Sequence, residues 1–97
     1  MQLKEAEKKI ILVLLKTYLP DCEIWLFGSR AKNTAGSFSD CDLMLKCADK
    51  IDLLNISQIE EAFAESDLTF KVDIVDWHRI KNDFQQHIMQ HALRLSP

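Results

Sequence analysis

Two aspartates one residue apart, Asp40 and Asp42, are the side chains of this chain best suited to carry out chemistry. Because side chains alternate across a β-strand, the two carboxylates would project from one face, about 7 Å apart. Carboxylate oxygens in such an arrangement suit hard divalent cations. A third aspartate, Asp73, stands between Val72 and Ile74 in a later apolar run. On the same sheet face it would complete a three-carboxylate cluster for two-metal phosphoryl or nucleotidyl transfer.

A glycine and a serine, Gly28 and Ser29, could supply the complementary chemistry, an anion-binding turn. Gly28 directly follows an apolar run and lets the backbone approach a ligand closely. Ser29 offers a hydroxyl and is predicted to cap a short helix over residues 30–34, whose free N–H groups favour an anion. The segment from Gly28 to Asp40 is short for a parallel crossover, so the two flanking strands are predicted to be antiparallel. That arrangement would place a phosphate site beside a metal site.

Hydrophobic periodicity predicts the elements that must hold these residues in place. Apolar residues at helical spacing predict an amphipathic helix over residues 3–19, which ends there because Pro20 cannot continue it. Three short apolar runs are predicted to be strands, over residues 23–27, 39–47 and 69–76.

Two further helices complete the pattern. Ser57 and Glu60 form a capping-box signature, which predicts a helix between the second and third strands. Helical spacing returns at Trp77 and leads to an extended tail at residues 92–95. The order α-β-α-β-α-β-α is typical of an α+β fold with a small mixed β-sheet, and we expect residues 1–97 to form a single domain.

Composition excludes some classes of function. The formal net charge is −3 and the pI is near 5.5, which argues against a general nucleic-acid-binding protein. The sequence has neither a long uninterrupted apolar run nor the pattern of a signal peptide. We therefore expect no membrane association and a cytoplasmic location.

The three cysteines, Cys22, Cys41 and Cys47, are odd in number and lack the C-x-x-C spacing. They are predicted to be reduced, mostly buried thiols, and not a disulfide or a zinc site.

Other conspicuous residues have simpler structural explanations. His87 and His91 lie four residues apart, but no Glu follows His87 as a zinc-protease motif requires, so both are predicted to be surface histidines. Asp76 falls on the opposite strand face from the third carboxylate and is predicted to end the strand or cap a helix. Trp25 and Trp77 are predicted to be core or interface anchors.

The spacing of these motifs resembles that of a known superfamily. An apolar residue, Gly28-Ser29, ten further residues, Asp40-Cys41-Asp42-Leu43 and a later apolar-flanked Asp73 together resemble the nucleotidyltransferases that include DNA polymerase beta. At about a hundred residues, the chain is most similar to the minimal nucleotidyltransferases, or MNT proteins, which are encoded beside HEPN-domain partners. The resemblance covers nearly the whole chain and implies a polymerase beta-like palm fold.

The resemblance implies a nucleotide-binding role for the turn and the short helix. Gly28 and Ser29 would hold the β- and γ-phosphates of a nucleoside triphosphate, with Arg30 or Lys32 near their charge. The chain departs from the common form, which has Arg-Gly where Lys32-Asn33 stands here. Lysine keeps the charge but loses the bidentate fork, which could weaken nucleotide binding. Asn33 tolerates a left-handed backbone, so the turn itself should survive.

The resemblance also implies metal ligands and a catalytic base. Asp40 and Asp42 would bind two Mg²⁺ ions, with Mn²⁺ as an alternative. Asp73 would share one metal and help to deprotonate the acceptor hydroxyl.

Three functions from different classes follow. The first is transfer of a nucleoside monophosphate, AMP from ATP, to a hydroxyl of a HEPN-type toxin, which makes the chain an antitoxin. The second is an antitoxin that neutralises its partner by contact alone, with a weak or inactive nucleotide site. The third is modification of a small molecule, as by the aminoglycoside-modifying members of the superfamily. It is disfavoured because those enzymes carry an additional helical domain for the acceptor. The acceptor is therefore expected on another chain, in a homo- or hetero-oligomer.

Overall fold

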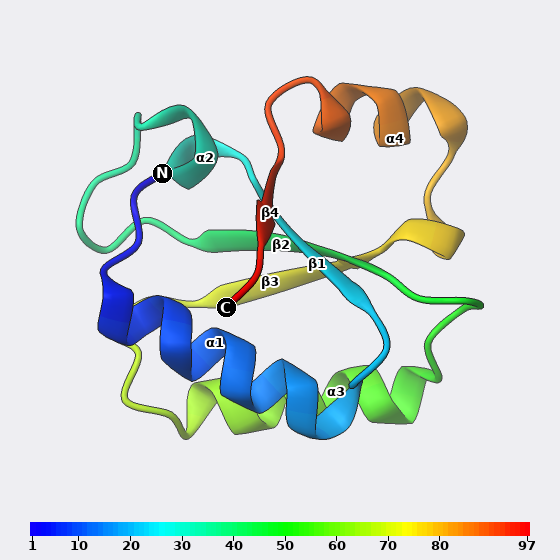
Figure 1. The fold of residues 1–97 in the computed structure, drawn as a ribbon, viewed down its shortest axis with the longest axis horizontal. Coiled ribbons are helices and arrows are strands. Elements are labelled where there is room, and N and C mark those ends of the chain that lie inside the picture. Colours follow the sequence, from blue (N-terminus) through cyan, green and yellow to red (C-terminus); the bar gives the residue numbers. More distant parts are fainter.

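The computed structural model describes residues 1–97 and confirms the predicted α+β architecture (Figure 1). One mixed sheet has the strand order β3-β2-β1-β4. β1 pairs antiparallel with both β2 and β4, whereas β2 pairs parallel with β3. The antiparallel pairing of β1 and β2 is as predicted. The strands are β1 (Glu23–Phe27), β2 (Cys41–Lys46), β3 (Val72–Asp76) and β4 (Leu93–Leu95).

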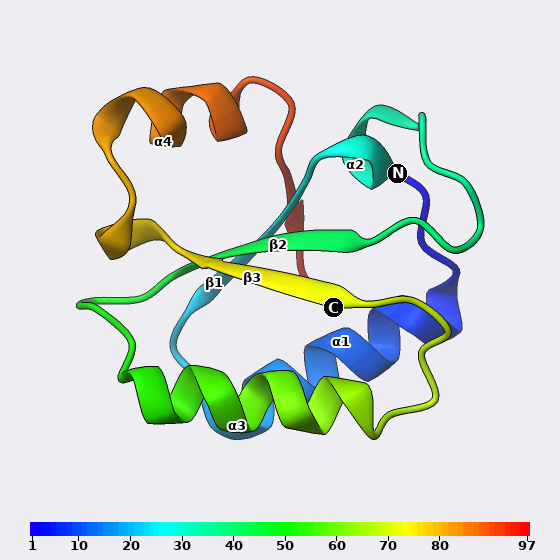
Figure 2. The same cartoon turned by 180° about the vertical axis from the view of Figure 1, so that it is seen from behind.

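Helices cover the sheet from two sides (Figures 1 and 2). On one side, α1 (Glu5–Tyr18) and α3 (Leu53–Ala64) pack against each other. On the other side lie α2 (Ser29–Lys32) and α4 (Asn82–Met89). None of the helices combines the length and the apolar character that crossing a membrane requires.

The main core fills the space between the sheet and the helices α1 and α3. Ile11 and Leu15, about one turn apart on α1, have no exposed surface, and neither has Ile59 of α3. From β2, Leu43 and Leu45 enter the same cluster and are fully buried. Full burial of one such side chain contributes about 1.5–3 kcal/mol relative to exposure. This burial fixes which face the remaining β2 side chains present.

The alternate residues of β2, Asp42 and Met44, belong to the opposite face of the sheet from Leu43 and Leu45, and Asp42 lies against Gly28 at the start of α2. Met44 is fully buried there, as is Ile88 of α4. Phe27 of β1 meets Phe84 of α4 edge to face, with 6.5 Å between the ring centroids. Because Phe27 lies opposite Asp42 in the β1–β2 pair, the contact between the two rings places α4 over the face of the sheet that carries Asp42.

Two helix predictions need correction. The N-cap of α3 is Asp52, whose side chain accepts a hydrogen bond from the backbone N–H of Leu54 at 2.9 Å. Ser57 lies inside the helix, so the capping box predicted there is wrong, because Asp52 already starts the helix more than one turn earlier. The helix predicted from Trp77 is divided by the extended backbone of Ile80 into a 3-10 turn (Trp77–Arg79) and α4. The predicted extended tail is present as β4.

The prediction of three reduced thiols is wrong for one pair. Cys22 and Cys47 form a disulfide, with 4.3 Å between their Cα atoms. The β1–β2 register pairs Glu23 with Lys46, so the next residues outward face each other. This register was not visible in cysteine spacing alone. Cys41 is free and buried, as predicted, and burial raises the pKa of its thiol to about 12.

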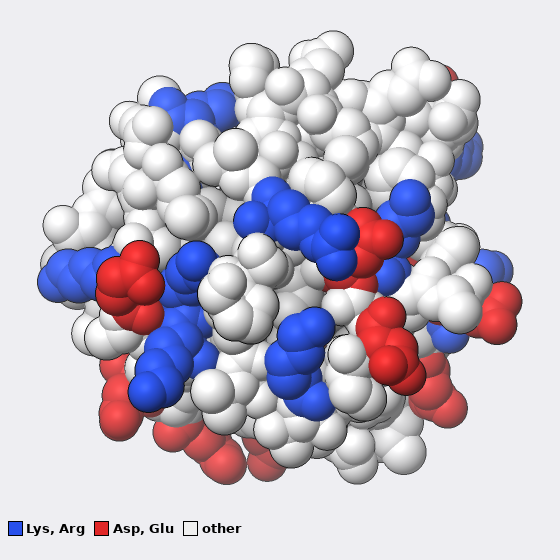
Figure 3. Space-filling model, in the orientation of Figure 1, with Lys and Arg blue, Asp and Glu red and all other residues white.

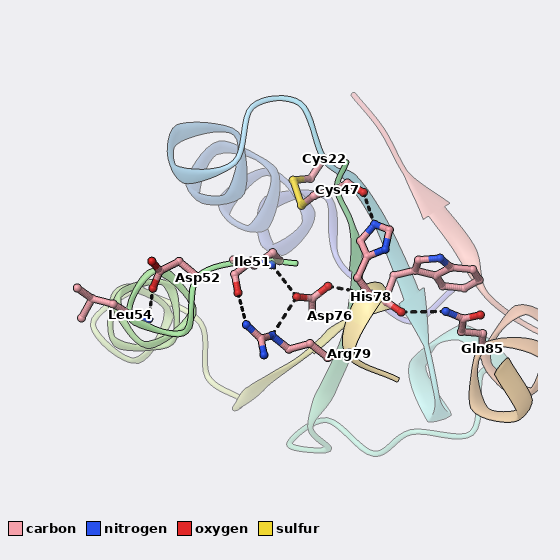
Figure 4. A network of polar contacts seen from close by, with 10 residues as sticks. Cys22, Cys47, Ile51, Asp52, Leu54, Asp76, His78, Arg79 and Gln85 are labelled. Carbon is pink, nitrogen blue, oxygen red and sulfur yellow. Dashed lines mark hydrogen bonds and ion pairs between the residues drawn. A yellow bond between two sulfur atoms is a disulfide. The ribbon is translucent and has the colours of Figure 1, made fainter. Parts of the chain in front are cut away.

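Asp76 is buried and has a structural role, as predicted (Figure 4). Its carboxylate accepts hydrogen bonds from the backbone N–H groups of Ile51 at 2.7 Å and His78 at 3.0 Å. Arg79 pairs with the same carboxylate at 3.3 Å and donates to the carbonyl of Ile51 at 2.8 Å. On the opposite side of this network, His78 Nε2 lies 2.6 Å from the carbonyl oxygen of Cys47. The network ties the end of β3 to the segment that enters α3.

The face that carries α1 and β4 has mixed charge (Figure 3). Lys and Arg side chains stand among Asp and Glu there, and they do not form a single uninterrupted basic stripe.

Candidate active site

Strand register brings two of the three predicted carboxylates together. In the parallel β2–β3 pair, Asp42 lies directly opposite Asp73. Neighbouring strands are about 5 Å apart, and residues opposite each other point to the same face. Asp40 is exposed and precedes the first residue of β2 by one position. All three carboxylates therefore gather at the end of the sheet where β2 and β3 begin.

The electrostatics of Asp42 show the effect of this grouping. Burial raises the pKa of the Asp42 carboxyl, and the negative charges of Asp73 and Asp40 raise it further. Both causes disfavour the ionised form. A cation bound between the carboxylates would relieve this repulsion.

Gly28 lies directly against Asp42. Its backbone has φ 74° and ψ −154°, and a Cβ at this position would overlap the carboxylate of Asp42. Only glycine combines that conformation with the necessary space. The turn after β1 and the carboxylate on β2 are thus adjacent, as the antiparallel arrangement predicted.

The short helix differs in detail from its prediction. α2 covers Ser29–Lys32, and its N-cap is Gly28, so the prediction that Ser29 caps the helix is wrong. The backbone N–H groups of Ala31 and Lys32 both reach the carbonyl of Gly28, at 3.2 Å. Asn33 ends the helix with a left-handed backbone, φ 61°, as predicted. Lys32 is exposed on this helix.

Arg30 is not where the sequence placed it. Only 4% of this residue is exposed, and its guanidinium donates to backbone carbonyls inside the protein. Its Cζ also lies 3.9 Å from the ring centroid of Phe70. The predicted position beside the nucleotide phosphates is therefore corrected: Lys32, and not Arg30, is the α2 cation that faces solvent.

A residue that the sequence reasoning missed, Lys71, pairs with Asp73 at 3.2 Å. The hydrogen bond to Asp73 raises the pKa of the Lys71 ammonium above its ordinary value, and the negative charges of Asp73 and Asp40 raise it further. The signal was available, because residues two apart on a strand share a face. Lys71 is a competitor for any cation that binds Asp73.

The positions of the acidic side chains bear on the predicted metal site. No three His, Cys, Asp or Glu side chains are grouped so that they could hold a metal ion as they stand. Asp73 is engaged by Lys71, and Asp42 and Asp73 repel each other. The donor set is still that of hard divalent cations, three carboxylates at one end of the sheet. The donor chemistry therefore suits Mg²⁺, but the three carboxylates do not converge on one ion as they stand.

The glycine turn against Asp42, the second carboxylate opposite it on β3 and the small mixed sheet are arranged as the resemblance to the nucleotidyltransferases implies. The family model described as Polymerase beta, Nucleotidyltransferase matches residues 8–96, and the chain belongs to this family.

Individual relatives show which nucleotidyltransferases this chain resembles. The chain is 38% identical to the probable protein adenylyltransferase MntA of Haemophilus influenzae, over 91% of this chain and 77% of that protein. It also resembles a toxin–antitoxin crystal structure with AMP-PNP, with a TM-score of 0.80 and 28% identity over 92% of this chain and 72% of that one. A minimal nucleotidyltransferase structure matches with a TM-score of 0.72 and 25% identity, over 91% of this chain and 88% of that one.

Proposed function

We propose that this nucleotidyltransferase transfers AMP from ATP to a hydroxyl of a HEPN-domain toxin and thereby acts as its antitoxin. The observation that carries the proposal is the contact of Gly28 with Asp42, and the placement of Asp42 opposite Asp73. The protein adenylyltransferase relative supports the reaction, and the toxin–antitoxin structure with AMP-PNP supports an antitoxin role with a nucleotide ligand.

Each site residue has a defined role in this proposal. Gly28 and Ser29 hold the β- and γ-phosphates, and Lys32 contributes positive charge beside them. Asp40 and Asp42, with Asp73, would hold Mg²⁺, which would supply Lewis-acid stabilisation of the charge on the transferring nucleotidyl group.

The transfer itself exchanges one phosphorus–oxygen bond for another. The acceptor hydroxyl oxygen bonds to the α-phosphorus, the bond from that phosphorus to the bridging oxygen breaks, and pyrophosphate leaves. Asp73 takes up the hydroxyl proton, because it lies on the strand at the open edge of the sheet, next to Asp42. Lys71 pairs with Asp73 and holds its carboxylate in place until metal and substrates bind.

A second function, neutralisation by contact alone, is favoured by two specific observations. Lys32-Asn33 replaces the common Arg-Gly, and the three carboxylates do not converge as they stand. A protein that binds its partner through another surface would tolerate both changes.

The test is the intact mass of the HEPN-domain partner after incubation with this protein, ATP and Mg²⁺. The proposal expects a mass increase of whole AMP units. The matched control replaces ATP with α,β-methylene-ATP, in which the bond that must break is not cleavable, and expects no adduct. Tight association without an adduct from ATP would favour neutralisation by contact.

A further inference from the structure

Arg30 is one of only two buried charged residues, and it lacks a carboxylate partner. The other, Asp76, is paired with Arg79. A buried charge is costly unless hydrogen bonds satisfy it. Every hydrogen bond of the Arg30 guanidinium goes to a backbone carbonyl, so its task is to hold main chain.

The main chain that Arg30 holds is the approach loop, residues 33–40, which leads into Asp40. Nε and Nη2 of Arg30 both donate to the carbonyl of Ser39, at 3.1 and 2.8 Å. Nη2 also donates to the carbonyl of Ser37 at 3.2 Å. The peptide that accepts two of these bonds is the one that joins Ser39 to Asp40.

Gln2 holds the other end of the same loop. Its side-chain oxygen accepts from the backbone N–H of Ala35 at 2.6 Å, and its side-chain nitrogen donates to the carbonyl of Ala35 at 3.0 Å. Gln2 and Arg30 are joined in turn, because the backbone N–H of Gln2 donates to the carbonyl of Arg30 at 2.8 Å and Arg30 Nη1 donates to the carbonyl of Gln2 at 2.9 Å. Figure 1 shows the N-terminus beside α2.

The aromatic ring of Phe70 packs against the guanidinium of Arg30. The ring is almost fully buried, and it lies against Arg30 in cation–π geometry. Phe70 immediately precedes Lys71, whose carbonyl accepts the backbone N–H of Cys41 at 2.8 Å. The loop before β2 and the segment before β3 are therefore fixed to the same guanidinium.

We infer that Gln2 and Arg30 form a clamp that positions Asp40 for metal binding, so that both are positioning residues for nucleotidyl transfer. The inference deepens the proposed function and depends on it. Asp40 is exposed and lies outside β2, so the sheet alone does not fix its backbone. The clamp supplies that constraint, and a ligand held within about 0.5 Å of its productive position is what a metal site requires.

The experiment compares Mn²⁺ binding to four proteins by electron paramagnetic resonance: wild type, Gln2→Ala, Arg30→Lys and Ile59→Val. Gln2→Ala removes both bonds to Ala35 without touching the core. Arg30→Lys keeps the charge and loses the paired donors. Ile59→Val is the control, because it weakens the core between α1, α3 and the sheet, away from the loop.

The clamp predicts that both clamp variants bind Mn²⁺ at least about tenfold more weakly than wild type, well below their melting temperatures. Ile59→Val should bind Mn²⁺ as wild type does. Amide hydrogen exchange, followed by mass spectrometry without metal, should be faster at residues 33–40 in Gln2→Ala and unchanged there in Ile59→Val.

The outcomes separate the inference from the proposed function. Unchanged Mn²⁺ affinity in both clamp variants, with only lower melting temperatures, would overturn the positioning role and leave a purely structural one. Unchanged loop exchange in Gln2→Ala would overturn the clamp itself. If wild type binds no Mn²⁺ even with ATP, the proposed metal-dependent function is wrong. The positioning role is then wrong as well, even if amide hydrogen exchange shows that Gln2 and Arg30 hold the loop.

Discussion

At the scale of single residues, Gly28 and Asp42 constrain each other most tightly. Gly28→Ala would place a Cβ on the Asp42 carboxylate and would force an alanine into a left-handed conformation, φ 74°. Strain of this kind costs about 1–3 kcal/mol. We expect urea denaturation to show a loss of that size, together with loss of metal binding. Gly36→Ala is the matched control, because its Cβ would meet only Ser39 Oγ, at an ordinary 3.6 Å. Equal losses in the two variants would contradict the special role of Gly28.

Asp42→Asn tests chemistry separately from folding. Asparagine keeps the shape and one oxygen of the side chain but removes the charge that a divalent cation prefers. Nucleotide transfer to the partner should fall by at least about a hundredfold, as for removal of one electrostatic stabiliser of the transition state. The measurement is the rate at which the partner gains AMP mass, with partner binding measured alongside. An adduct formed at the wild-type rate would remove Asp42 from the catalytic machinery.

The same substitution should stabilise the fold near neutral pH. Burial and the neighbouring Asp73 and Asp40 raise the pKa of Asp42 in the folded protein above its unfolded value. The folded state therefore binds the proton more tightly, and the contribution of Asp42 to stability is lost as pH rises through its folded pKa. Without metal, Asp42→Asn should melt higher than wild type at about pH 8 and gain less at about pH 4. A gain that does not change with pH would contradict this origin.

At the scale of elements, the Cys22–Cys47 disulfide joins the start of β1 to the end of β2, away from the carboxylates. It closes a loop with a sequence separation of 25. By the loop-entropy argument, such a link stabilises the fold by about 3.5 kcal/mol. Cys22→Ser should therefore lower the denaturation midpoint by a corresponding amount and leave Mn²⁺ affinity unchanged. The control is wild type with reductant, which should match the variant. Altered metal affinity would show that the two ends of the sheet are coupled.

The elements also show what the sequence could predict. The three main strands follow from apolar runs, and the β1–β2 pairing follows from the short connection between Gly28 and Asp40. The start of α3 was misplaced because two capping signals, Asp52 and Ser57, lie close together and only packing chooses between them. The Cys22–Cys47 pairing requires the strand register, which apolar runs do not give.

In the candidate site, the sequence predicted side-chain direction only where the backbone fixes it. Strand alternation correctly placed Asp42 and Asp73 on one face, because that period is fixed by the backbone. Arg30 was placed beside the phosphates because only its charge and neighbours were considered. The carbonyls that it binds belong to Gln2, Ser37 and Ser39, and no local pattern brings these together.

At the scale of the whole molecule, nucleotide and metal should act as one stabilising ligand. The turn that we propose to bind phosphates lies between β1 and α2, and the carboxylates belong to β2 and β3 or the loop before β2. A bound Mg²⁺–ATP complex would therefore join elements that also share the main core. A ligand that binds only the folded state, at a hundred times its dissociation constant, stabilises it by about 2.7 kcal/mol. For a domain of this size we expect the melting temperature to rise by on the order of 10 °C.

Mg²⁺ with tripolyphosphate should produce much of this shift, because the proposed contacts are made to phosphates, whereas ATP with EDTA should produce little. Asp42→Asn is the matched variant, since it keeps the fold and should lose the metal-dependent part of the shift. A rise of equal size with and without Mg²⁺, or none with any of the four common nucleoside triphosphates, would contradict a metal-dependent nucleotide site and favour neutralisation of the partner by contact.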